Sequence, residues 1–294
     1  MKILFNKEFF LHNVDCSFEG AYRIKDFADL KDSWYSGEEY LSLVHEQAYI
    51  DSIKEACLKN VKLAEINLNK DSWQAAMLSA GLTILASEQN DFAVARPPGH
   101  HAERNRAEGF CLFNNIAIAT QRLVNQGKRV MVFDFDAHHG NGTQNIFYDT
   151  DKVLYTSIHQ VYTYPMTGFA DEKGVGAGEN YTINIPLVPG SGNKEFMSAF
   201  EKILVAGMAF NPDVVAVSAG FDGYKKDQML SLSYTLNLFF DIGFKLRRTF
   251  PNVFATLEGG YHKYIRECVD HFVEGVNKGG KPPSIKWNED MAIG

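Results

Sequence analysis

Nine residues, Asp134 to Gly142, carry the densest set of reactive side chains in this chain. They read Asp-Phe-Asp-Ala-His-His-Gly-Asn-Gly and overlap the end of an almost unbroken apolar run, Arg129 to Phe135. Such a run is typical of a buried parallel strand, and burying unpaired charges beside it would cost much free energy. A divalent metal ion resolves this conflict because it gives the charges a partner. The segment predicts a metal site at the carboxyl end of a strand, where open α/β sheets place ligands.

Three further segments place polar residues that are hard to bury after apolar, strand-like runs. In chain order, the runs and the residues that follow them are Phe92–Ala95 with His100 and His101, Val214–Ala219 with Asp222, and Val253–Leu257 with Tyr261. Since loops after the strands of such sheets build functional sites, we expect these residues to complete the metal site.

The elements that must position these residues alternate along the chain. Strand-like runs occur at Phe92–Ala95, Arg129–Phe135, Val153–His159, Tyr181–Pro186, Val214–Ala219 and Val253–Leu257. Apolar residues at helical spacing occur at Val44–Lys62, Trp73–Ala86, Ile116–Val124, Lys194–Ala209 and Leu232–Leu246. Strands that alternate with helices predict an α/β fold with a mainly parallel sheet covered on both faces.

Five motifs together resemble the zinc-dependent histone deacetylase superfamily, which includes bacterial histone deacetylase-like amidohydrolases and acetylpolyamine amidohydrolases. They are Pro98–His101, Gly109–Asn115, Asp134–Gly142, Ser218–Gly223 and Gly259–Tyr261. Their order is that of the family, which makes the signal specific, and the resemblance runs roughly from Leu41 to Tyr264. It implies a three-layer α/β/α fold of the arginase/deacetylase type and hydrolysis of an acylated amine.

The resemblance implies one catalytic Zn²⁺ per chain, bound by Asp136, His138 and Asp222. Two carboxylates and one imidazole leave an open coordination position for water, as a catalytic zinc requires. Iron(II) or cobalt(II) could occupy the same ligands. The family also has structural K⁺ or Na⁺ sites. The residues that match the first are Asp134, Asp136, His138, Ser157 and Ile158, and those that match the second are Phe147, Thr150, Val153 and Tyr181.

Amide hydrolysis needs a base to activate water and an acid to protonate the leaving amine. The resemblance implies that Asp134 orients His100, that Asn141 orients His101, and that His101 is the main general base and acid. Asp134 would raise the pKa of its imidazole, whereas Asn141 adds no charge, so we expect the pKa of His101 to stay nearer the working pH. Asn141 stands where some branches have Asp, which is similar to the class II and bacterial branches.

The resemblance assigns the remaining pocket residues to the substrate. Tyr261 would donate a hydrogen bond to the scissile carbonyl, and Gly259–Gly260 would let the backbone turn to expose its phenol. Phe110 would flank the substrate's methylene chain, and the Gly109 carbonyl would accept a hydrogen bond from the substrate amide. Tyr164 would form the opposite wall, where many relatives have Phe.

The pocket mouth is where the sequence departs from the family. The segment His12–Arg23 lacks the prolines of a motif that many relatives carry there. A polyamine substrate would require a carboxylate at the mouth, whereas Lys225 and Lys226 would repel it if they faced the pocket. We expect an open mouth and broad acceptance of small acylated amines. The candidate carboxylates are Glu19, Asp171, Glu172 and Asp227.

Length, composition and charge limit the number of domains, the kinds of partner and the cellular location that we expect. With 294 residues and 45% hydrophobic composition, residues 1–294 are expected to form a single domain, with residues 277–294 as a loosely ordered tail. The net charge of −7 disfavours direct nucleic-acid binding. No apolar stretch approaches the ~20 residues of a membrane span. Four scattered cysteines favour a cytoplasmic protein.

The sequence leaves two alternative functions open. An arginase-like ureohydrolase shares the fold, but it needs additional aspartates to hold two metal ions. A non-catalytic acyl-lysine binding protein would not need the complete set of candidate catalytic residues. The sequence leaves the acylated substrate, the acyl-chain length and the oligomeric state undetermined.

Overall fold

A parallel sheet of seven strands, in the order β1-β4-β9-β8-β5-β6-β7, forms the centre of the computed structural model. The structure describes residues 1–12, 16 and 18–280. Every pairing within this sheet is parallel. The strands are β1 Ile3–Leu4, β4 Phe92–Ala93, β5 Val130–Asp134, β6 Val153–Gln160, β7 Thr182–Leu187, β8 Val214–Ala219 and β9 Val253–Leu257.

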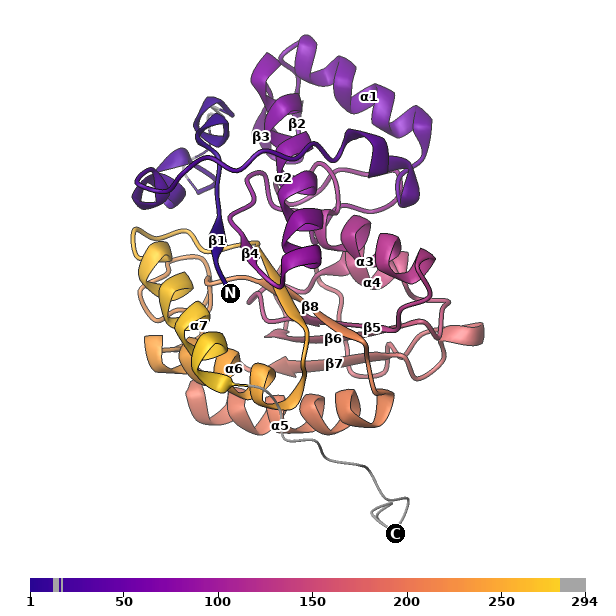
Figure 1. Cartoon of the computed structure of the whole chain (residues 1–294), viewed down its shortest axis with the longest axis vertical. Helices are drawn as coiled ribbons and strands as arrows, with labels where there is room; N and C mark the ends of the chain where they lie inside the picture. Colours follow the sequence, from indigo (N-terminus) through magenta and orange to yellow (C-terminus); the bar gives the residue numbers. More distant parts are fainter. Residues whose placement is uncertain (13–15, 17, 281–294) are drawn as a thin grey trace.

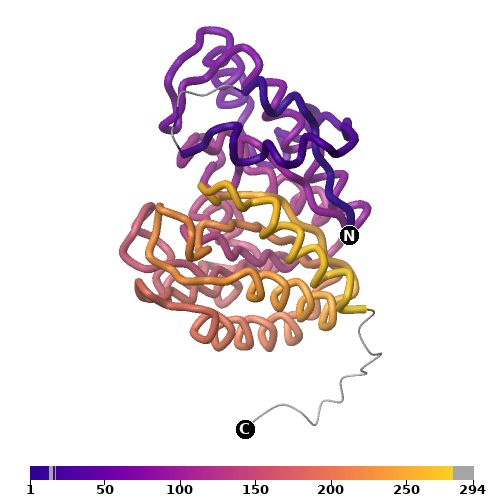
Figure 2. Tube along the Cα trace, turned by 90° about the vertical axis from the view of Figure 1, so that its left-hand side faces the viewer, coloured from indigo at the N-terminus to yellow at the C-terminus, as the bar shows by residue number. Residues whose placement is uncertain are grey.

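Helices cover both faces of this sheet, which gives the three layers that the resemblance implied. Helices α2 and α3 lie against one face, and α5, α6 and α7 lie on the other (Figures 1 and 2). The helices are α1 Gln47–Leu58, α2 Lys70–Gln89, α3 Asn115–Asn125, α4 Asn141–Ile146, α5 Asn193–Phe210, α6 Leu236–Thr249 and α7 Ile265–Gly279. The predicted α/β class and parallel sheet are confirmed.

Local sequence explains where α2 begins and ends. The Asn69 side chain accepts the N–H groups of Asp71 and Ser72, each at 3.0 Å, and so satisfies donors that the first turn leaves free. The helix ends at Asn90, whose φ of 58° is the left-handed conformation that stops a helix. Among the residues that the structure describes, no helix is both long and apolar enough to cross a membrane.

Some elements differ from those that the sequence predicted. Strand β4 is shorter than the predicted run Phe92–Ala95. The sequence did not predict β1, α4, α7 or the hairpin of β2 (Lys62–Leu63) and β3 (Ile66–Asn67). Three residues assigned to the tail, 277–279, belong to α7, and residues 281–294 lie outside the described part of the chain. That residues 1–294 form one domain stays a prediction.

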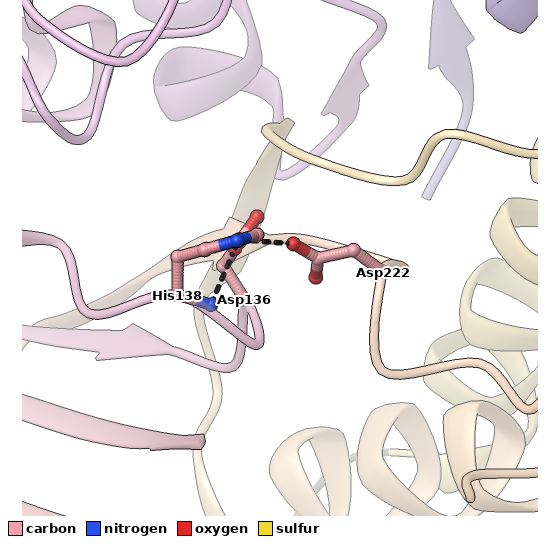
Figure 3. A group of neighbouring side chains, drawn as sticks. All are labelled: Asp136, His138 and Asp222. Atoms are coloured by element: carbon pink, nitrogen blue, oxygen red, sulfur yellow. Dashed lines mark hydrogen bonds and ion pairs between the residues drawn. The ribbon is translucent and has the colours of Figure 1, made fainter. Parts of the chain in front are cut away.

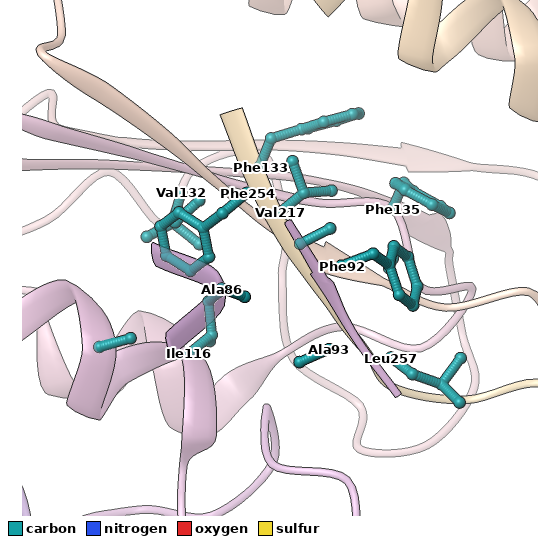
Figure 4. Packing of buried hydrophobic residues seen from close by; sticks show 14 of the residues in the cluster. Ala86, Phe92, Ala93, Ile116, Val132, Phe133, Phe135, Val217, Phe254 and Leu257 are labelled. Carbon is teal, nitrogen blue, oxygen red and sulfur yellow. The ribbon is translucent and has the colours of Figure 1, made fainter. Parts of the chain in front are cut away.

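The core holds β5 in place and thereby fixes the residues that follow it. All five residues of β5 are buried, and Phe133 stacks on Phe200 of α5 with ring centroids 5.0 Å apart. Phe135 contacts Phe221 and Phe272 (ring centroids 5.6 and 5.7 Å) in the cluster that Figure 4 shows in part. Burying each such ring contributes roughly 1.5–3 kcal/mol. Because β8 lies between β5 and β9, the loops after these three strands emerge side by side.

Candidate active site

Asp136, His138 and Asp222 come together beyond the carboxyl ends of β5 and β8. One potential ligand atom from each lies within 4.8 Å of the others, and all three residues are buried. The Nδ1 atom of His138 lies 2.6 Å from Oδ2 of Asp222 and 3.3 Å from Oδ1 of Asp136 (Figure 3). The same ring nitrogen therefore faces both carboxylates.

The electrostatics of this cluster suit a bound cation. Burial alone would lower the pKa of His138, but the Asp222 and Asp136 carboxylates outweigh it and raise the pKa to about 10. Burial raises the pKa of Asp222 to about 7. The backbones of Gly220 and Gly259 lie so close to the Asp136 side chain that a Cβ atom on either glycine would overlap Oδ2 of Asp136. This packed donor set of two carboxylates and one imidazole fits Zn²⁺.

The two neighbouring histidines each have a different side-chain partner. His100 Nδ1 lies 3.0 Å from Oδ2 of Asp134, and His101 Nδ1 lies 2.7 Å from Oδ1 of Asn141. Burial opposes the charged form of His100, but the carboxylates of Asp134 and its neighbours prevail and raise its pKa to about 10. For His101, burial lowers the pKa well below its usual value, and the adjacent His100 lowers it further. The expectation that this pKa stays near the working pH is not met in this structure, because burial and the neighbouring histidines outweigh the Asn141 hydrogen bond and the Asp136 carboxylate, which raise it.

Glu258 is a site residue whose role the sequence did not reveal. Its buried carboxylate accepts the backbone N–H groups of Gly99 (2.7 Å) and His100 (3.1 Å), and it also accepts the hydroxyl of Ser218 (3.2 Å). It therefore fixes the loop that carries both histidines. Its position directly after β9 marks it as a candidate site residue. Its role could not be predicted, because its partners lie far away in the sequence.

The Tyr261 backbone is held from both sides. Asp227 Oδ2 accepts its N–H at 2.6 Å, and the Tyr22 hydroxyl donates to its carbonyl at 3.2 Å. The buried Arg23 guanidinium donates to the carbonyl of Gly260, whose φ of +117° favours glycine. Burial raises the pKa of the Tyr261 phenol well above its ordinary value. The hydroxyl therefore stays protonated near neutral pH and can donate a hydrogen bond.

A pocket of about 380 Å³ reaches these groups. It brings the expected wall residues to the same cavity as His101 and His138, and aromatic side chains together with Met229 form much of its lining. Such walls suit an alkyl chain. The lining residues are Cys16, Phe18, Glu65, His101, Gly109, Phe110, His138, Tyr164, Met229 and Tyr261.

Two of the carboxylates predicted for the mouth lie elsewhere. Glu19 is fully buried and pairs with Arg23 (3.0 Å) and Arg96 (3.1 Å). Asp227 has a buried side chain and binds the Tyr261 backbone. Both assignments to the mouth were wrong, because these side chains find partners in the interior that the sequence does not show.

The other charges named for the mouth are also placed differently. Glu172 accepts the N–H groups of Gly168 and Phe169, both at 3.0 Å, and so braces its own loop. Asp171 is exposed, and it lies outside the pocket lining. The ammonium group of Lys226 packs over the ring of Tyr264, 3.9 Å from its centroid. Neither Lys225 nor Lys226 lines the pocket. The pocket walls therefore do not place these two charges against a cationic substrate.

Glu65 is the charged residue that the sequence did not single out for the pocket. It lies at the turn between β2 and β3, with a φ of 65°, and its carboxylate accepts the N–H of Gly109 at 3.0 Å. No local signal marks it, because its partner lies 44 positions further along the chain.

The residues matched to monovalent cation sites fall into two groups. In the first, Ser157 of β6 stands in register with Asp134 of β5, next to the metal cluster. In the second, Phe147 directly follows α4, Thr150 lies in the loop before β6, Val153 begins β6 and Tyr181 directly precedes β7. Binding of K⁺ or Na⁺ at either group stays a prediction.

Comparisons with known proteins agree with this geometry. The model of the histone deacetylase domain matches residues 23–276. A probable deacetylase of Archaeoglobus fulgidus is 36% identical over 83% of this chain and 72% of its own length. Acetylpolyamine amidohydrolase 1 of Pseudomonas aeruginosa is 40% identical over 67% of this chain and 60% of its own.

A solved structure has the same fold as this chain. The crystal structure of an acetylpolyamine aminohydrolase from Burkholderia pseudomallei superposes with a TM-score of 0.84 at 27% identity. The match covers 96% of this chain and all of that one (100%). The family model spans most of the chain, and so do the sheet and the loops that carry the site. The chain belongs to the histone deacetylase family.

Proposed function

We propose that this protein is a zinc-dependent amidohydrolase that removes acetyl or other short acyl groups from acyl-lysine, an acetylpolyamine or a related small acylated amine. One observation carries the proposal. His138 of the three-donor cluster lines one pocket with apolar walls together with His101 and Tyr261. The names of the relatives, which are deacetylases and an acetylpolyamine amidohydrolase, support the same reaction.

The side chains divide the work of hydrolysis. When bound by Asp136, His138 and Asp222, Zn²⁺ supplies Lewis-acid polarisation of the carbonyl and lowers the pKa of water. His101, oriented by Asn141, takes a proton from the attacking water and returns it to the leaving amine. The Tyr261 hydroxyl donates a hydrogen bond to the oxygen on which negative charge develops. Apolar walls around Phe110 hold the alkyl chain and keep bulk water out.

The two alternative functions fit less well. Within the described residues, the one group of three or more potential metal-binding side chains is the Asp136, His138 and Asp222 cluster. A binuclear ureohydrolase would need further carboxylates to bridge a second ion. A non-catalytic acyl-lysine binder would have no need for His101 and Tyr261 in the pocket beside the metal ligands.

A turnover screen tests the proposal. Zinc-loaded protein is incubated with an acetyl-lysine peptide, acetylputrescine, acetylspermidine and longer acyl-lysines, and free amine is measured. We expect hydrolysis of both peptide and polyamine substrates, with kcat/KM values that differ by less than about 10³-fold, which corresponds to about 4 kcal/mol. Glu65 at the mouth favours the cationic amines within that range. Absence of turnover on all substrates by metal-loaded protein would contradict the proposal.

The two histidines are expected to differ in their contribution. His101→Ala removes the group that moves the proton, whereas His100→Ala removes a neighbour that is tied to Asp134. We predict a loss of kcat of about 10²–10⁴-fold for His101→Ala, the range of general acid–base catalysis, and residual turnover for His100→Ala. Steady-state kinetics of both variants at saturating zinc gives the comparison. Equal activity in the two variants would refute the division of roles.

Several wider properties remain proposals. The cytoplasmic location rests on the four cysteines, all of which are free in the structure. A structural K⁺ or Na⁺ ion is proposed from the resemblance. The expectation of no direct nucleic-acid partner rests on the net charge of −7, and the expectation of no membrane partner rests on the lack of a span-length apolar stretch.

A further inference from the structure

Glu108, the residue before Gly109 of the active-site pocket, lines a second cavity. This cavity has a volume of about 300 Å³, and Glu108 and Asn141 both line it. Only 19% of the Glu108 side chain is exposed. Its carboxylate receives the guanidinium of Arg106 at 2.6 Å and the side-chain amide of Asn141 at 3.4 Å. The carboxylate thus stands one hydrogen bond beyond the partner of His101.

We propose that Glu108 is a positioning residue that fixes the tautomer of His101 by orienting the amide of Asn141. The inference rests on the proposed function, in which His101 moves the proton. It adds a residue that neither the sequence motifs nor the pocket lining single out.

The donors and acceptors of Glu108, Asn141 and His101 determine which tautomer forms. An amide has a donor end and an acceptor end of nearly equal shape, so Asn141 alone could present either end to His101. A carboxylate only accepts hydrogen bonds. Glu108 therefore selects the orientation in which Nδ2 of Asn141 faces it and Oδ1 faces His101. Nδ1 of His101 must then carry the proton, which leaves the lone pair on Nε2.

That tautomer is the one that can act as a base. If the amide turned over, its NH₂ group would favour a lone pair on Nδ1 and a proton on Nε2. Nε2 is the ring nitrogen that Asn141 leaves free, and it could then no longer accept a proton from water. An aspartate in place of Asn141 could only accept, so it would need no second residue. With Asn141 in place, Glu108 supplies the acceptor that selects the amide orientation, one hydrogen bond further from His101.

Arg106 holds the Glu108 carboxylate in place through an ion pair at 2.6 Å. The guanidinium binds Glu108 and, at 2.7 Å, Glu103 as well. Burial raises the pKa of Tyr164 and the Glu108 carboxylate raises it further, so Glu108 also lies beside the far wall of the pocket. The alternative is that Glu108 only anchors Tyr164 and does not orient Asn141. An experiment must distinguish these two roles.

The first measurement reads the tautomer directly. Protein labelled with ¹⁵N-histidine and loaded with zinc is studied by NMR at neutral pH, and the His101 signals are assigned by their loss in His101→Gln. We expect a single tautomer with the proton on Nδ1 in the wild type and a mixture in Glu108→Leu. Tyr164→Phe and Glu103→Gln are the matched controls, because they leave the Glu108–Asn141 contact in place, and both should keep the wild-type tautomer.

Kinetics gives the second measurement. Glu108→Leu should lower kcat roughly 10-fold with little change in KM, well below the ~10⁴-fold effect of disturbing a direct orienting partner. Adding Asn141→Asp to Glu108→Leu should restore the tautomer and most of kcat, since an acceptor-only side chain again faces His101. An unchanged tautomer in Glu108→Leu, or no rescue by Asn141→Asp, would overturn the inference. Because the tautomer is read without turnover, a wild type that hydrolyses no acylated amine would sink the proposed function and still leave this test intact.

Discussion

Asp222→Ala and Asp136→Ala are each expected to abolish metal binding and turnover together. Each change removes one of the three donors of a buried cluster in which Nδ1 of His138 lies between the two carboxylates. Loss of the Lewis acid removes several kcal/mol of transition-state stabilisation, or at least about 10³-fold in kcat/KM. Metal content per chain, measured by mass spectrometry after dialysis, should fall from about one to near zero.

The control for these variants is Asp171→Ala. Asp171 is an exposed carboxylate in the loop after β6, outside the metal cluster and the pocket lining. It should retain both the metal and the activity of the wild type. Circular dichroism of all three variants checks that the sheet still forms. Full activity in metal-free protein, or wild-type metal content in Asp222→Ala, would reject the metal assignment.

Tyr261→Phe should lower kcat by about 10²–10³-fold, the scale of one lost oxyanion donor, with a much smaller effect on KM. The change removes only the hydroxyl. The backbone of residue 261 stays held by Asp227 and Tyr22, so the ring should keep its position at the pocket wall. The loss is therefore expected in the transition state and not in substrate binding.

The pH dependence and a control sharpen this test. Since burial raises the pKa of the Tyr261 phenol, its hydroxyl remains a donor throughout the neutral range, and the ratio of wild-type to Tyr261→Phe activity should be constant between about pH 6 and pH 8. Tyr162→Phe alters a tyrosine that is 77% exposed on the loop after β6 and should behave like the wild type. An unchanged kcat in Tyr261→Phe would assign Tyr261 to packing alone.

The sequence by itself determined the chemistry of the site and the class of fold. Carboxylates and histidines directly after apolar runs conflict with burial, and that conflict is local, so it can be recognised at Asp136 and His138 without a structure. The strands β8 and β9 were placed to the residue because their apolar runs are short, unbroken and bounded by polar residues or glycine. Helices with strong apolar spacing, such as α3 and α5, were placed within one residue at each end.

Only the tertiary structure decided which charges face the pocket. Glu19 looked like a mouth carboxylate, but Arg96, 77 positions away, holds it in the interior. Glu65 and Glu108 carry no motif, and their roles come from partners that the chain brings close only when the sheet and its loops have formed. Local patterns report whether a residue tolerates burial. The partner that makes its burial possible is a long-range contact, and that contact exists only in the folded chain.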